Sequence, residues 1–163
     1  INLSQLDEGD GYQWSTVDLY SVAQEVTASL EQCADEKNVT LRTEGEHVRL
    51  PGVPELLRGI VYNLTDNAIK YNRPGGAVRL SVTPEPEKLL IRVSDTGPGI
   101  PERFQRSVFQ PFFRVDKSRS REYGGVGLGL SLVWEIVKLH GGTVCVENSS
   151  EAGTTVAVSL PLR

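Results

Sequence analysis

Asn63, Asn67 and Lys70 combine residue types and a spacing that could serve metal and phosphate chemistry. In a helix that turns about 100° per residue, these side chains lie within about 60° of one another. Taken alone, they are typical of a solvated face with a polar i,i+4 pair. The alternative is functional, because an amide oxygen can ligate Mg²⁺ and a lysine can meet phosphate oxygens. The apolar stripe of the same helix is a separate set: Leu57, Val61, Leu64 and Ala68.

A carboxylate directly follows a strand pattern in the motif Asp95-Thr96-Gly97-Pro98-Gly99-Ile100. Glycines at this point let the backbone bend sharply and let a ligand approach closely. An ordinary Asp-containing turn accounts for the motif when it is taken alone. The functional alternative is an acceptor placed over a ligand site at the end of the strand.

A glycine run, Gly124-Gly125-Val126-Gly127-Leu128-Gly129-Leu130, precedes a helix that we expect to start near Ser131. Free amides and the helix dipole favour anions at such an N-terminus. The run is not a dinucleotide-binding fingerprint, since no βαβ unit precedes it, and it lacks the Gly-Lys-Ser/Thr of a P-loop. By itself it is weak support for phosphate binding.

Aromatic residues gather in the segment 109–114, and the polar segment 116–123 follows without periodicity. This composition is typical of a lid held by aromatic residues, so we expect residues 115–125 to become ordered over a triphosphate. A plain surface loop is the alternative. A last small motif, Gly153-Thr154-Thr155, stands at the start of the final strand.

Periodicity and turn residues predict the elements that position these groups. Helices are expected at 20–37, 54–71 and 131–140, with a short one within 100–112, and strands at 17–19, 38–44, 46–51, 77–84, 89–95, 143–148 and 154–162. This order predicts an α/β two-layer sandwich with helices on one face of a mixed, mainly antiparallel sheet. Residues 1–13 are expected to be the end of an upstream helix and a linker.

Composition narrows the class of protein. The 163 residues are 39% hydrophobic, which is enough for a core, and the net charge of −4 disfavours nucleic acid and anionic membranes as partners. Cys33 and Cys145 lack nearby Cys or His partners, so we expect reduced thiols and neither zinc nor disulfides. No apolar run is long enough to span a membrane. Because the sequence has no Met and opens on Ile1, we expect it to be part of a longer protein.

Together, in this order and spacing, the motifs resemble the ATP-binding catalytic domain of bacterial two-component sensor histidine kinases. N-L-T-D-N-A-I-K-Y resembles the Asn box of that family, and D-T-G-P-G resembles its first Gly box. F-Q-P-F-F-R resembles the Phe box, G-G-V-G-L-G-L the second Gly box and A-G-T-T the third. The resemblance runs from about Trp14 to Arg163 and implies the Bergerat fold of the GHKL ATPases, with residues 14–163 as the ATP-binding domain.

For the base of the nucleotide, the resemblance implies three side-chain roles. Asp95 would accept a hydrogen bond from the adenine amino group, Thr154 would assist through water, and Tyr71 would line the adenine side. It implies further nucleotide-binding positions in the Gly boxes, with Gly127 and Gly129 presenting backbone amides to the triphosphate. These positions are Gly97, Gly99, Gly125, Gly127, Leu128 and Gly129.

For the phosphates, the resemblance implies ATP and Mg²⁺ as cofactors. Asn67 would ligate Mg²⁺ with Asn63 nearby, and Lys70 and Arg114 would meet the phosphates, so that Asn67, Lys70 and Arg114 form the catalytic set. The Phe box departs from the family pattern, because Pro111 stands where many relatives have an Arg. Arg114 would then contact the phosphates without a second arginine from the Phe box.

Neither histidine stands in the phosphoacceptor pattern of the family. His47 lies in an expected strand and His140 precedes a helix-ending Gly-Gly, so both are expected to be structural or surface residues. The resemblance therefore implies an acceptor His on a separate dimerisation domain of a homodimeric parent, and a response regulator as the next partner. It also implies a monomeric fragment that is a cytoplasmic domain of a parent attached to the bacterial inner membrane.

The residue type at position 63 indicates whether the domain can activate water for hydrolysis of ATP. In the hydrolases of this superfamily a Glu four residues before the metal-binding Asn activates water, whereas Asn63 does not titrate. We therefore expect ATP-dependent phosphorylation of a histidine, with slow hydrolysis. The alternative is a nucleotide-binding regulatory module that controls a phosphatase activity of the parent. A serine kinase of the anti-sigma type is disfavoured by the long Phe box and by Arg114.

Overall fold

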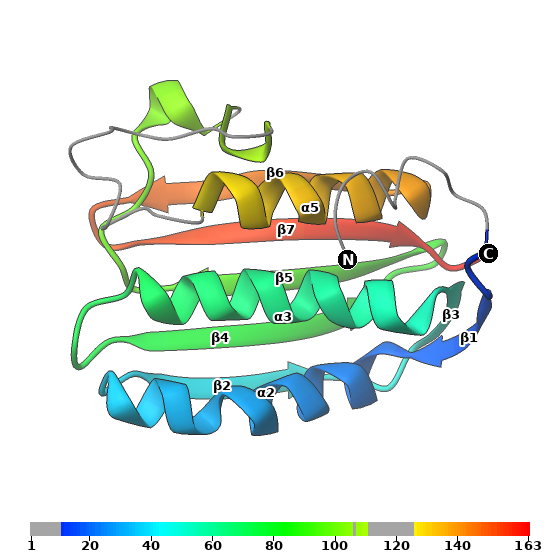
Figure 1. Cartoon of the computed structure of the whole chain (residues 1–163), viewed down its shortest axis with the longest axis horizontal. Helices are drawn as coiled ribbons and strands as arrows, with labels where there is room; N and C mark the ends of the chain where they lie inside the picture. The colour runs from blue at the N-terminus through cyan, green and yellow to red at the C-terminus, as the bar shows by residue number, and fades with distance from the viewer. Residues whose placement is uncertain (1–10, 106, 111–125) are drawn as a thin grey trace.

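The computed structural model describes residues 11–105, 107–110 and 126–163, with only the backbone for 126–129. In this part of the chain, three long helices lie side by side on one face of a five-stranded sheet (Figure 1). The helices are α2 (Leu19–Glu36), α3 (Pro54–Lys70) and α5 (Val126–Leu139). The prediction of a two-layer α/β sandwich is confirmed.

The five-stranded sheet has the strand order β2-β4-β5-β7-β6. Its members are β2 (Thr40–Gly45), β4 (Ala77–Pro84), β5 (Lys88–Asp95), β6 (Thr143–Ser150) and β7 (Gly153–Pro161). Among these strands β2 and β4 pair in parallel, whereas the other neighbours are antiparallel. The sheet is therefore mixed and mainly antiparallel, as the sequence predicts.

The core lies between the helices and the sheet. Alternate residues of β4 and β5 are fully or almost fully buried, such as Leu80 and Ile91. Leu57 of α3 and Ile136 of α5 are also fully buried in the same cluster. Period-two burial in the strands and a single buried stripe on each helix are what a two-layer fold requires.

Some elements differ from the sequence-based expectation. The strands β1 (Ser15–Asp18) and β3 (Arg49–Gly52) pair with each other in a separate antiparallel sheet. His47 lies in the loop before β3 rather than in a strand, and its Nδ1 is 2.9 Å from Asp18 Oδ2. Periodicity identifies strands but not their partners, so this small sheet could not be predicted.

The glycine run and the segment after Ile100 also differ. Helix α5 begins at Val126 rather than near Ser131, because its packing against α3 overrides the poor helix propensity of glycine. In place of one short helix, the structure has two 3₁₀ turns, η1 (Glu102–Phe104) and η2 (Ser107–Phe109). In the described part of the chain, no helix is long and apolar enough to cross a membrane.

His140 connects the start of α3 to the end of α5. Its buried ring accepts a hydrogen bond from the N–H of Val53 at Nε2 (3.1 Å) and donates one from Nδ1 to the carbonyl of Ile136 (2.8 Å). This pattern requires the neutral ring. Burial lowers the pKa of His140, although the hydrogen bond to Ile136 opposes the shift. His140 is therefore a structural histidine, as expected from the sequence.

Mild acid should weaken the fold through His140. Because its pKa is lowered in the folded chain, the unfolded chain binds the proton first. The stabilisation is complete above the unfolded pKa of about 6.5 and is lost as the pH falls below it. Urea unfolding should show a loss of about 1 kcal/mol from pH ~7.5 to ~5.5, comparable to one buried hydrogen bond. His140→Gln should flatten this slope, and exposed His47→Gln is the matched control. An unchanged slope in His140→Gln would refute the assignment.

Candidate functional site

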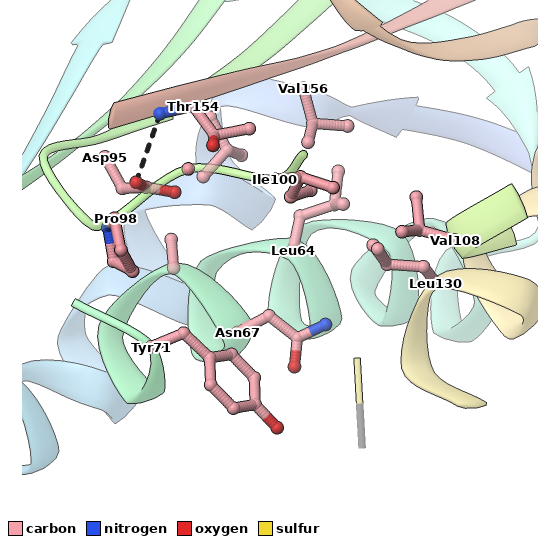
Figure 2. Close-up of a pocket in the computed structure, with 13 residues that line it drawn as sticks. Leu64, Asn67, Tyr71, Asp95, Pro98, Ile100, Val108, Leu130, Thr154 and Val156 are labelled. Atoms are coloured by element: carbon pink, nitrogen blue, oxygen red, sulfur yellow. Dashed lines mark hydrogen bonds between the residues drawn. The ribbon is translucent and has the colours of Figure 1, made fainter. Parts of the chain in front are cut away.

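A pocket opens where the C-terminal half of α3 meets the ends of β5 and β7 (Figure 2). It encloses about 630 Å³, including space open to solvent. Five residues predicted from the sequence line it: Asn67, Tyr71, Asp95, Gly99 and Thr154.

Among the described residues that line this pocket, Asp95 is the charged one. It is the last residue of β5 and pairs in register with Thr154 of β7. Its Oδ1 accepts hydrogen bonds from the N–H of Gly97 (2.9 Å) and the N–H of Thr154 (3.2 Å). Both hydrogen bonds go to Oδ1, so Oδ2 can accept a hydrogen bond from a ligand in the pocket. Burial raises the pKa of Asp95, and the two backbone hydrogen bonds oppose this shift.

Glycines allow the chain to pack closely around Asp95. Gly153 has φ +145°, and a Cβ there would overlap the carbonyl oxygen of Asp95. Gly99 has φ +84°, and a Cβ there would overlap the carbonyl oxygen of Ser150. Both positions combine a backbone conformation that favours glycine with a contact that excludes any side chain. The glycines of these motifs therefore shape the pocket.

Asn67 contributes the amide of the pocket. It projects from α3 between Tyr71 and Leu64 (Figure 2). Its Nδ2 is buried and has no hydrogen-bond partner among the described residues. A buried donor without a partner costs about 1–3 kcal/mol. The amide nitrogen of Asn67 therefore makes no hydrogen bond within the described part of the protein and is available to a ligand.

Asn63 and Lys70 lie on α3 but do not line the pocket. Asn63 Nδ2 donates to the carbonyl of Gly59 (2.8 Å), and Lys70 Nζ lies 2.9 Å from Asp66 Oδ2. The hydrogen bond and charge of Asp66 raise the pKa of Lys70. The i,i+4 pairing of Lys70 with Asp66 was missed, although the spacing could have revealed it. An exposed pair of this kind contributes less than about 1 kcal/mol, so Lys70 is readily released.

The apolar lining of the pocket was also missed from the sequence. Leu64, Val93 and Val156 occupy positions that periodicity assigns to the core, so nothing in the pattern marks them as ligand contacts. Ile100 directly follows the first Gly box, and this position was the one available signal. In Figure 2 the apolar side chains extend from the Asp95 end of the pocket toward Val108 and Leu130.

Asn72 is a further residue that the sequence did not reveal. Its Nδ2 donates to the carbonyl of Ala77 (3.0 Å), and its Oδ1 accepts from the hydroxyl of Thr96 (3.1 Å). The side chain is buried. It therefore ties the end of α3 to β4 and to the loop that follows Asp95, and keeps Asn67 and Asp95 on opposite sides of one pocket.

The other predicted residues belong to the glycine run and the Phe box. Gly127, Leu128 and Gly129 lie in the first turn of α5, where backbone amides have no acceptor within the helix. Leu130 lines the pocket, so this helix start adjoins it. Gly97 lies beside the pocket and donates to Asp95. Arg114, Gly125 and the expected lid at 115–125 lie outside the described residues.

Known proteins resemble this chain in sequence and in overall fold. Residues 52–163 match the family model described as histidine kinase-, DNA gyrase B-, and HSP90-like ATPase. The chain is 35% identical over 170 residues to hybrid signal transduction histidine kinase D of Dictyostelium discoideum, which covers 99% of this chain and 11% of that protein. It is 42% identical over 106 residues to the sensor histidine kinase WalK of Bacillus subtilis, covering 64% of this chain and 17% of WalK.

A solved structure shares the fold closely. The nucleotide-free catalytic domain of the histidine kinase ThkA superposes with a TM-score of 0.81 and 26% identity, covering 92% of this chain and 96% of that one. The present chain spans less than one fifth of the length of the two curated relatives above. With the family model matching about two thirds of its residues, the chain belongs to the histidine kinase-, DNA gyrase B- and HSP90-like ATPases and has the ATP-binding catalytic domain found in sensor histidine kinases.

Proposed function

We propose that this domain binds Mg²⁺-ATP and donates the γ-phosphate to a histidine on the dimerisation domain of its parent sensor kinase. The observation that carries the proposal is one pocket lined both by the half-buried carboxylate of Asp95 and by Asn67, whose amide nitrogen has no hydrogen-bond partner among the described residues. Such a pocket offers an acceptor for a base at one side and a polar ligand at the other. The first turn of α5, whose backbone amides have no acceptor within the helix, adjoins it.

Adenine fits the Asp95 side of the pocket. Oδ2 of Asp95 would accept a hydrogen bond from the exocyclic amino group, since Oδ1 is occupied by two backbone amides. The apolar side chains of Leu64, Ile100 and Val156 would contact the ring. A mostly apolar pocket with a few directed polar groups is typical of a small-molecule site.

The residues at the Asn67 side fit Mg²⁺ and phosphate. Mg²⁺ is usually held by one or two protein oxygens together with substrate phosphates and water. Asn67 would supply an amide oxygen, and Asn63 a second one nearby, because its nitrogen is bonded to Gly59. When bound, Mg²⁺ neutralises charge on the phosphates and fixes their geometry. Lys70 would leave Asp66 to meet the phosphates, together with Arg114 of the Phe box and the amides of Gly127 and Gly129.

The chain orients the triphosphate rather than activating a nucleophile. Asn63 stands where the hydrolases of this superfamily carry a Glu, and an amide cannot act as a general base. Phosphoryl transfer depends mostly on positioning and charge neutralisation. An imidazole brought by the dimerisation domain would therefore attack the γ-phosphate in line with the departing ADP.

A response regulator is the proposed final acceptor. ThkA, whose catalytic domain has the same fold, has been crystallised in complex with the response regulator TrrA. By analogy, the phosphohistidine of the parent would pass its phosphate to an aspartate of such a protein. The parent is proposed to be a homodimer, attached to the inner membrane, in which residues 1–13 lead from the dimerisation helix into this domain.

Asp95→Asn should abolish most adenine recognition without weakening the empty fold. The amide replaces a charged acceptor by a neutral group that also presents donors. Calorimetric titration should show ATP binding weakened about ten- to a hundredfold. Because burial raises the pKa of Asp95, the ionised carboxylate costs folding free energy as the pH rises above its pKa, and Asn removes this cost. At pH 7 the melting temperature should therefore not fall.

A double readout makes this test specific. A variant that binds ATP as tightly as the wild type would refute the adenine role of Asp95. A variant that loses both binding and stability would show that the carboxylate is structural. Asp35→Asn, at an exposed position of α2, is the matched control and should bind ATP as the wild type does.

Asn67→Asp should abolish phosphate transfer. The domain alone should not label itself from radioactive ATP, but it should slowly label the dimerisation domain of its parent supplied in trans. The extra negative charge at the metal–phosphate site should reduce transfer by at least about a hundredfold. Asn148→Asp, at an exposed position of β6, is the control and should transfer normally.

The stability of the label identifies the reaction. A phosphohistidine is lost in acid and survives in base, in contrast to a phosphoserine. Acid-stable label on serine would assign the domain to the anti-sigma type of kinase. Tight ATP binding without any transfer to a competent acceptor would favour the regulatory-module alternative.

A further inference from the structure

A short chain of hydrogen bonds links the backbone directly after the first Gly box to Thr154. The N–H of Ile100 donates to Ser149 Oγ at 2.7 Å, and Ser149 Oγ lies 2.8 Å from Thr154 Oγ1. Thr154 is 6% exposed and lines the pocket, whereas Ser149 lies behind it on β6. Ser149 does not line this pocket itself, so an effect of Ser149 on a ligand passes through one of its two partners, Thr154 or Ile100, which both line it.

The hydrogen bond between the two hydroxyls can run in either direction in the empty pocket, and a bound base distinguishes the two. Each hydroxyl has one proton and can accept two hydrogen bonds. Ser149 already accepts from Ile100. Either direction satisfies both contacts and leaves one hydroxyl proton over, that of Ser149 or that of Thr154. Thr154 lines the pocket and Ser149 does not, so a base with an acceptor atom in the pocket can receive the proton of Thr154 only. A bound base therefore favours donation from Ser149 to Thr154.

We propose that Ser149 is a positioning residue that orients the Thr154 hydroxyl as a hydrogen-bond donor toward the bound base. This proposal rests on the proposed function, because it concerns the same nucleotide pocket. With the acceptor Oδ2 of Asp95 beside it, the pocket presents one acceptor and one donor. The backbone of Thr154 is bonded to Asp95 in the same register, so the two groups are held side by side.

This arrangement matches one edge of a six-amino purine. The amino group donates to Asp95, and the unprotonated ring nitrogen N1 accepts from Thr154, directly or through one ordered water. A six-oxo purine presents the opposite pattern, with an acceptor at position 6 and a donor at N1. Both of its groups would then face a group of the wrong kind, which is a strong basis for discrimination.

The test compares ATP with 1-deaza-ATP, in which N1 is replaced by C–H, by calorimetric titration in the presence of Mg²⁺. The wild type should bind ATP about five- to tenfold more tightly than the analogue, which corresponds to one hydrogen bond. Ser149→Ala should lose most of this preference, because ATP binding weakens while binding of the analogue changes little. Ser149→Thr keeps a hydroxyl at this position and should therefore prefer ATP over 1-deaza-ATP as the wild type does. Ser150→Ala, one residue along and exposed, should behave like the wild type.

The outcomes separate this proposal from the proposed function. Equal weakening of both nucleotides in Ser149→Ala would make Ser149 a structural residue only and would overturn the proposal. An unchanged preference for ATP in Ser149→Ala would also overturn it. If the wild type binds neither nucleotide, the proposed function itself is wrong, and the positioning role fails with it.

Discussion

The site depends on the antiparallel pairing of β5 with β7, which sets Asp95 opposite Thr154. In this register the N–H of Thr154 bonds to the carboxylate of Asp95, and Gly153 packs against its carbonyl. A slip of β7 by one residue would reverse its two faces. Thr154 and Val156 would then leave the pocket. The register thus determines both the acceptor and the apolar wall of the site.

This arrangement has an energetic cost in the empty protein. Burial raises the pKa of Asp95, so its ionised form is less favourable in the folded chain than in water. The buried amide of Asn67, which has no partner in the described part of the chain, adds a second cost. Uncompensated polar groups of this kind are characteristic of functional sites. A ligand that donates a hydrogen bond to Asp95 and accepts one from Nδ2 of Asn67 would relieve both costs.

Local patterns in the sequence predict the elements better than the contacts between them. The helix that carries Asn67, the strand that ends at Asp95 and the two-layer arrangement all follow from periodicity and turn residues. The strand partners do not, because pairing joins residues far apart in the chain. For the same reason, the hydrogen bond between Ser149 and Thr154 and the contact of His140 with α3 could be found only in the structure. The start of α5 was misplaced because glycine propensity conceals a helix that tertiary packing stabilises.

The most direct test is a crystal structure of the domain with Mg²⁺ and a non-hydrolysable ATP analogue. The expected result is a base whose amino group lies within hydrogen-bond distance of Asp95 Oδ2, between Ile100 and Leu64, with the triphosphate running past Asn67 to the start of α5. A nucleotide bound elsewhere, or a base in this pocket whose amino group faces away from Asp95, would contradict the assignment of Asp95 as the group that recognises adenine.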